Sequence, residues 1–334
     1  MKPIKKNLNI AALLLAALAA LLPESGLAQN DVQFTQYWAV PTVYNPAYSG
    51  QTDDIRIRLG GRMQWLGIHN APKSFLGTAD MAVKLGKKQR LGVGVNAVSE
   101  TLGLFNNLFI GAQASYRFRF LKGTWSVGVQ PAYYSSKFKG SKVELPDDDD
   151  YHQGTDQAIP TNDVAGNAFD ISAGVMYSHK YFNVGVSCLH ILEPKVEYNR
   201  EGQETTSEEE VYSVPLTRQM YFTADGNIPI KNSLFSLQPS LLVRTDFANF
   251  SAEATMRATY KKFLSFGLGY RYKDAVSAMI AAEFKNFFLG YSYDYPTSAI
   301  SKASSGSHEV VLGYKVKLNY GEKNKNKQRS IRIM

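Results

Sequence analysis

Beyond the first fifty residues, apolar and polar side chains alternate along the chain with a period of two. Residues 110–120 are representative: Ile110 and Phe118 lie on one face, and Gln113 and Arg117 lie on the other. This period is typical of a β-strand whose two faces meet different surroundings. The alternation recurs until about residue 320, so we expect an all-β chain.

The length of these segments distinguishes a membrane barrel from a soluble β-sandwich. They run for about 10 to 12 residues, which matches a tilted membrane-spanning strand and exceeds the usual ~5–6 residues of soluble strands. Their apolar faces contain many alanines and glycines and carry Tyr or Phe near the ends, as a lipid-facing band with aromatic girdles does. We therefore predict a transmembrane antiparallel β-barrel over residues 55–320.

We count about fourteen segments, and an even number suits a closed bacterial barrel with both termini in the periplasm. The connections also sort into two kinds. The even-numbered ones are short and often basic, whereas the odd-numbered ones include the long loops 137–167 and 190–217. Short periplasmic turns and long extracellular loops are expected of such a barrel. The segments begin near residues 55, 74, 90, 108, 124, 168, 181, 218, 234, 249, 263, 277, 286 and 309.

The longest apolar run lies at the N-terminus and predicts a secretory signal peptide over residues 1–28. Lysines precede the run at residues 10–22, and small residues at Gly26 and Ala28 indicate cleavage before Gln29. The alternative is an uncleaved anchor helix, but the run is shorter than the ~20 residues that span a bilayer. We therefore expect export to the outer membrane.

The charge of the chain does not indicate nucleic-acid binding. Much of the formal net charge of +8 comes from the signal peptide and from the basic tail at residues 321–334, which we place in the periplasm. The single cysteine excludes an intramolecular disulfide framework.

Both long loops are acidic, and we place them outside the cell. A calcium site is one interpretation, but EF-hand spacing is missing, so solvated loops are favoured. A contact with an exported protein is a further hypothesis. The acidic residues are Asp147, Asp148, Asp149, Asp150, Glu208, Glu209 and Glu210.

No pattern in the chain predicts catalysis, a cofactor or a metal site. The five histidines are scattered without metal-ligand spacing, and the G-x-S-x-G nucleophile motif is missing. Ser292 and Asp294 share an inward face, as alternation alone would produce. The charged inward faces suggest either an ion-selective pore or, as we favour, a lumen filled by ion-paired side chains. These faces include Arg62, Arg271, Glu253, Asp294 and Glu309.

Residues 29–54 precede the first strand and do not alternate. Pro41 and Pro46 exclude a regular strand or helix interior, and the segment is rich in aromatic side chains that need a packing partner. It either plugs the periplasmic mouth of the barrel or contacts a periplasmic partner, and the two are compatible. The candidate contact residues are Phe34, Tyr37, Trp38, Tyr44, Asn45, Pro46 and Tyr48.

This segment resembles the N-terminal motif of the PorP/SprF family of type IX secretion membrane proteins. A D-x-Q-F-[ST]-Q-Y stretch stands at Asp31–Tyr37, and a Y-N-P-A-Y-[AS]-G stretch stands at Tyr44–Gly50. The similarity continues at Gly61–Trp65, Gly290–Asp294 and Gly306–Glu309, so it spans the mature chain. The acidic loops match no family motif.

The resemblance implies an outer-membrane component of Bacteroidota that serves type IX secretion, gliding motility or the anchoring of adhesin-like surface proteins. It also implies contacts with periplasmic components of the machine, and it brings no catalytic or cofactor residues. Two other functions remain open on the residues alone, a passive porin and an outer-membrane hydrolase. The missing triad disfavours the hydrolase.

Overall fold

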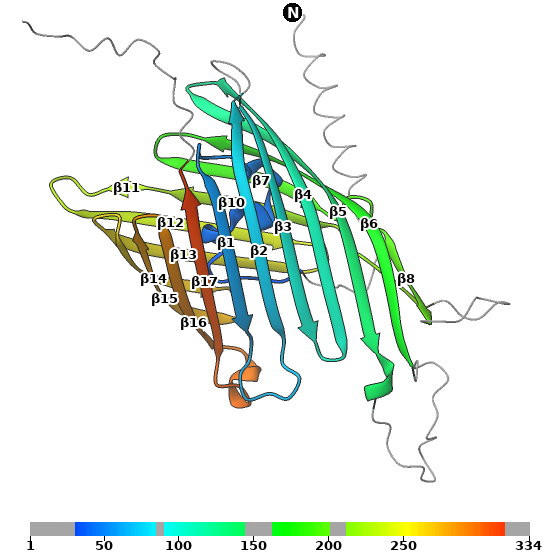
Figure 1. Ribbon diagram of the computed structural model, residues 1–334. Coiled ribbons are helices and arrows are strands. Elements are labelled where there is room, and N and C mark those ends of the chain that lie inside the picture. The colour runs from blue at the N-terminus through cyan, green and yellow to red at the C-terminus, as the bar shows by residue number, and fades with distance from the viewer. Residues whose placement is uncertain (1–30, 85–89, 144–161, 201–211, 318–334) are drawn as a thin grey trace, which may run out of the picture.

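A computed structural model describes residues 31–84, 90–143, 162–200 and 212–317 (Figure 1). The predicted signal peptide, the seven loop acids at 147–150 and 208–210, and the basic tail lie outside the described residues. Among the described residues, no helix is long and apolar enough to cross a membrane.

The fold is a closed antiparallel barrel of fourteen strands, as the alternation predicts. Each wall strand pairs with its neighbours along the chain, and β1 pairs with β17 from Ile55–Val316 to Met63–His308 to close the sheet. The wall strands are β1 (Ile55–Met63), β2 (Lys73–Lys84), β3 (Arg90–Leu102), β4 (Phe105–Phe120), β5 (Gly123–Lys139), β6 (Asp163–Ser178), β7 (Phe182–Leu189), β10 (Gln219–Gly226), β12 (Phe235–Thr245), β13 (Phe250–Tyr260), β14 (Leu264–Arg271), β15 (Ala275–Phe284), β16 (Phe287–Pro296) and β17 (Ser307–Val316).

Three further strands extend this wall. The short β11 (Ile228–Pro229) pairs with β12 beyond the end of β10. The region predicted as the long loop 190–217 contains a hairpin instead, in which β8 (Lys195–Arg200) pairs with β6 and with β9 (Tyr212–Pro215). The hairpin is stable there because its apolar side chains are buried against β5 and β6. This buried cluster comprises Tyr134, Val164, Val196, Tyr198 and Leu216.

The two faces of the wall differ as a membrane barrel requires. Apolar side chains point outward and are exposed, such as Leu59 at 56%, whereas polar side chains such as Ser126 and Gln130 point inward and are fully buried. Exposed aromatic residues occur near both ends of the wall, for example Phe120 and Phe287 at one end and Tyr295 at the other. The aromatic girdles expected from the sequence are therefore present.

The two ends of the barrel carry different connections. One end, which we call the turn end, has short hairpin turns such as Leu121–Lys122 and Lys261–Phe263. Leu121 and Lys122 both have positive φ, as a two-residue type I′ turn requires. The opposite end, the loop end, carries the longer connections, including the β8–β9 hairpin and the 3₁₀ helix η4 (Ala299–Lys302) at the bottom of Figure 1.

Candidate functional site in the barrel lumen

Residues 31–54, which we call the lumen segment, lie inside the ring of strands (Figure 1). At one extremity Asp31 bonds to His190, which directly follows β7 at the loop end. At the other, Asp53 pairs with Arg90, at the turn-end start of β3. The segment therefore passes through the lumen from the loop end to the turn end.

Short helices and aromatic side chains shape the segment. It contains the 3₁₀ helices η1 (Tyr37–Ala39) and η2 (Pro46–Tyr48) and one helical turn, α2 (Pro41–Tyr44). Pro46 and Pro41 occupy the first helical position, where a missing N–H costs nothing. The prolines that exclude a strand thus begin two of its helical turns.

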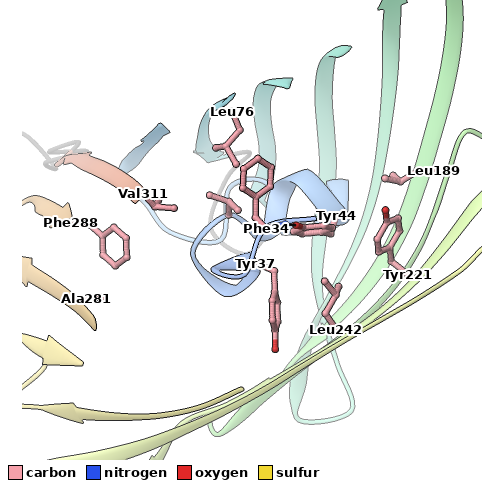
Figure 2. Close-up of a cluster of buried hydrophobic side chains, with 11 residues drawn as sticks. Phe34, Tyr37, Tyr44, Leu76, Leu189, Tyr221, Leu242, Ala281, Phe288 and Val311 are labelled. Atoms are coloured by element: carbon pink, nitrogen blue, oxygen red, sulfur yellow. Dashed lines mark hydrogen bonds between the residues drawn. The ribbon is translucent and has the colours of Figure 1, made fainter. Parts of the chain in front are cut away.

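Aromatic side chains of the segment fill the centre of the lumen (Figure 2). Phe34 and Tyr44 are buried between Leu76 on β2 and the opposite wall. The Tyr44 ring lies 5.5 Å from that of Tyr221 on β10, with Leu242 of β12 in the same cluster. Burial of these aromatic side chains against apolar residues of the wall holds the segment between opposite sides of the barrel.

The first polar anchor is formed by Thr35 and Gln36. Glu309 on β17 accepts the backbone N–H of both residues, each at 2.8 Å. The Thr35 hydroxyl donates to Asp294 at 2.6 Å. Arg62 on β1 binds Asp294 at 2.7 Å and Glu309 at 3.1 Å, so the segment and the closing strands share one ion-pair network.

A second arginine completes this network. Arg271 on β14 binds Glu253 at 2.9 Å and Asp294 at 3.5 Å, and it donates to the Thr35 hydroxyl at 3.1 Å. The side chains are almost inaccessible to water, so losing one partner would leave an uncompensated buried charge. The predicted lumen of ion-paired side chains is therefore present, and the lumen segment is tied into it.

The second anchor is Asn45. Its side-chain oxygen accepts the N–H of Ala47 at 2.9 Å and so caps η2. Its amide nitrogen donates to the backbone oxygens of Val175 at 3.2 Å and Val186 at 3.3 Å, on β6 and β7. An asparagine is needed here because one end must accept and the other must donate.

Glycines of the wall allow this close approach. A Cβ on Gly128 would lie 2.4 Å from the backbone nitrogen of Ala47, and one on Gly174 would lie 2.2 Å from the Asn45 side-chain oxygen. Neither distance is possible for a real side chain. The strand glycines are thus the contact points of the Tyr44–Gly50 motif.

The third anchor is Gly50 near the turn end. It has a φ of +67°, and its N–H donates to Asp80 at 2.8 Å, a carboxylate that also binds Arg56 at 2.8 Å. A Cβ on Gly50 would lie 2.4 Å from the Cα of Gly92. Both the positive φ and the lack of space require glycine at this motif position.

At the loop end, His190 holds the first described residue of the segment. Its Nε2 lies 2.9 Å from Asp31 and its Nδ1 lies 2.7 Å from Asp170. Burial opposes the charged imidazole, but the two carboxylates outweigh burial and raise the pKa of His190 to about 10. Burial also acts against the Asp31 carboxylate, but His190 and then Arg244 lower the Asp31 pKa.

These shifts predict a pH dependence. The raised pKa of His190 gives stability that is complete below its ordinary value of 6.5 and is lost as the pH rises to about 10. The lowered pKa of Asp31 gives stability that is complete above 3.8 and is lost at lower pH. The Tm difference between the wild type and His190→Gln should therefore be largest near pH 6 and shrink toward pH 10. His69→Gln, in an exposed loop, is the matched control, and a constant difference for His190→Gln would contradict the prediction.

The structure brings the seven candidate contact residues together inside the barrel. Six of them are buried, and Trp38 is partly buried. Contact with a partner stays a prediction for all seven. Sequence reasoning missed the pairing of His190 with Asp31, because a lone histidine between a strand and a loop carries no motif.

The comparisons with known proteins complete this description. The chain matches the profile of the family described as type IX secretion system membrane protein PorP/SprF over residues 26–314. The protein belongs to this family. The resemblance read from the five motifs is thereby confirmed, and this PorP/SprF protein is a membrane protein of the type IX secretion system with an outer-membrane barrel fold. No curated protein matches the chain.

Several solved structures are similar to this PorP/SprF protein. The toluene transporter TodX of Pseudomonas putida is 9% identical, with 82% of this chain and 92% of TodX covered at a TM-score of 0.45. The translocator domain of the autotransporter NalP from Neisseria meningitidis is 13% identical, with coverage of 85% and 94% and a TM-score of 0.41. The outer membrane protein Omp33 of Acinetobacter baumannii is 6% identical, with coverage of 80% and 100% and a TM-score of 0.42. We transfer no function from them.

Proposed function

We propose that this PorP/SprF protein is a non-conducting outer-membrane barrel that supports the secretion or surface anchoring of an exported protein. It docks periplasmic components of the type IX machinery at its turn end and meets the exported protein at its loop end. It is exported by a cleaved signal peptide and performs no catalysis. The family supports the secretion role, and the short hairpin turns support a periplasmic turn end.

The lumen segment is the main support for a barrel that does not conduct. A fourteen-stranded barrel is wider than the eight-stranded ones that side chains alone can fill, and 16- to 18-stranded porins hold an aqueous channel. Here residues 31–54 cross the space and are fixed by three polar anchors and an aromatic cluster. A scaffold that docks other proteins needs such closure, because an open pore would leak solutes.

Conductance and secretion together test this function. We expect the purified protein to show no stable open channel in planar bilayers, whereas a passive porin would conduct continuously. Deleting the gene should abolish secretion or surface display of the served protein, and a plasmid copy should restore it. Secretion and display that are unchanged after deletion would overturn the proposed function.

A further inference from the structure

A water-accessible cavity remains in the lumen beside the lumen segment, on the side of the turn end. Its volume is about 320 Å³. One side is formed by Trp38 and its neighbours on the segment, and the other by β1, β10, β12, β13 and the residues around the β15–β16 turn. The cavity contains charged side chains that take no part in the anchoring described above.

Two buried arginines without an ion pair line the cavity. Arg58 is 9% exposed and Arg257 is 7% exposed, and among the described residues neither has a carboxylate oxygen within 4.0 Å. Arg257 donates to the Ser240 hydroxyl at 3.1 Å, and Arg58 donates to the Ile57 carbonyl at 3.2 Å. The Nε atoms of both arginines have no hydrogen-bond partner. A guanidinium has five donors, so most of its binding capacity is unused here.

The other charged side chains of this cavity are already partnered. Arg56 binds Asp80, and Lys315 binds Glu283. Asp225 accepts from Tyr48 at 3.3 Å and is held by the Asn183 amide on β7. Among the described residues, Asp225 is bound only by neutral groups and offsets one of the two unpaired arginines, so the cavity keeps an excess of positive charge on buried groups, where a missing counter-ion is costly.

An aromatic pair separates the two guanidinium groups. Arg257 lies 3.6 Å above the Trp38 ring, and Arg58 lies 4.7 Å above the Phe288 ring. The two rings meet edge to face at 5.9 Å. The cavity thus presents two cationic positions with an apolar surface between them, rather than one compact cationic pocket.

Wall glycines provide the space for both arginines. Gly313 faces Arg58 across the β1–β17 seam, and a Cβ there would lie 2.2 Å from Arg58 Nη1. Gly267 faces Arg257 across β13 and β14, and a Cβ there would lie 2.7 Å from Arg257 Cγ. Each guanidinium therefore lies over a strand position that holds no side chain, which fixes its direction.

From these observations we infer that the cavity is a binding site for the carboxylates of an acidic peptide segment that enters from the turn end. Two separated guanidinium groups fit two carboxylates of one extended chain, and each can be bound through a bidentate pair. The aromatic surface between them fits an apolar side chain of the same segment. This inference rests on the proposed function for the source of the peptide, a periplasmic component of the machinery.

The inference can be tested with the purified full-length barrel in detergent. The probe is a fluorescein-labelled peptide in which two glutamates flank a phenylalanine, and its binding is followed by anisotropy. We expect saturable binding to the wild type. The affinity of Arg58→Gln and of Arg257→Gln for the peptide should be lower by about tenfold or more, because each variant loses a charged hydrogen-bond pair. Arg58→Lys and Arg257→Lys keep the charge but not the planar fork, so intermediate affinities are expected.

Matched controls exclude a general effect of charge or of folding. Arg218→Gln removes an arginine that pairs with Glu193 at the loop end, and it should bind the peptide as the wild type does. Replacing Trp65 and Trp125 by phenylalanine leaves Trp38 as the only tryptophan of a barrel that keeps both arginines. Its fluorescence should change when the peptide binds, and this test does not depend on the folding of an arginine variant.

Either of two results would overturn the inference. One is a wild-type barrel that binds the peptide no more tightly than inorganic pyrophosphate, and the other is Arg58→Gln and Arg257→Gln variants that bind as the wild type does. Peptide binding by a barrel whose gene is dispensable for secretion would instead leave the site standing and contradict the proposed function.

Discussion

Replacing Glu309 by alanine is expected to release the lumen segment and to destabilise the barrel by about 3–5 kcal/mol. The carboxylate accepts the N–H groups of Thr35 and Gln36 and binds Arg62 in a site that water does not reach. Its loss leaves two buried donors without acceptors and removes one of the two counter-charges of Arg62. Chemical denaturation of the reconstituted protein measures the free energy of unfolding.

Release of the segment can be followed with a Val40→Cys substitution, because the Val40 side chain is only 1% exposed. In a Cys188→Ser background, a water-soluble maleimide should label this cysteine readily in Glu309→Ala and slowly in the parent. Glu283→Ala is the matched control, because its ion pair with Lys315 is partly exposed and contributes less than about 1 kcal/mol. Equal labelling in Glu309→Ala and its parent would contradict the anchoring role.

Replacing Gly128 by valine is expected to give a barrel that conducts ions. The new Cβ would lie 2.4 Å from the backbone nitrogen of Ala47, and a backbone atom cannot rotate away as a side chain can. The segment is then excluded from its position, and the lumen of a barrel of this width fills with water. Planar-bilayer recordings should change from no channel to a stable open state.

The control for this experiment is Gly77→Val. Gly77 lies on the outward side of β2, where a Cβ would meet only Leu59 at an ordinary 3.5 Å. The same substitution there should leave the barrel closed. A Gly128→Val protein that folds and remains closed would show that the lumen segment does not block the channel.

The wall of this protein could be predicted from the sequence because each strand carries its own signal. The alternation over residues 110–120 or 250–260 can be recognised without knowing which strands lie beside it. The count of fourteen strands is confirmed, and the predicted start of the first strand at residue 55 agrees with the structure. The β8–β9 hairpin was missed, because Val196 and Tyr198 are buried by side chains of strands far away in the sequence, such as Tyr134 on β5 and Val164 on β6.

The path of the lumen segment could not be predicted in the same way. Its contacts join residues far apart in the chain: Thr35 meets Glu309, and Asn45 meets the backbones of β6 and β7. Such contacts depend on the register of strands that local patterns do not reveal. The aromatic residues and prolines indicated a packed, irregular segment, but the glycines that receive it are ordinary strand glycines until the wall is closed.

The seam between β1 and β17 has a consequence for how the barrel is assembled. It joins the first and last wall strands, so in chain order it is the final pairing to become available. The lumen segment immediately precedes β1, and its anchors lie on β2, β6, β7, β16 and β17. Residues 31–54 can therefore act as a template around which the sheet curls, with Glu309 and Arg62 marking the point where the two edges meet. Pairing of β1 with β17 and packing of the lumen segment would then occur in the same step of folding.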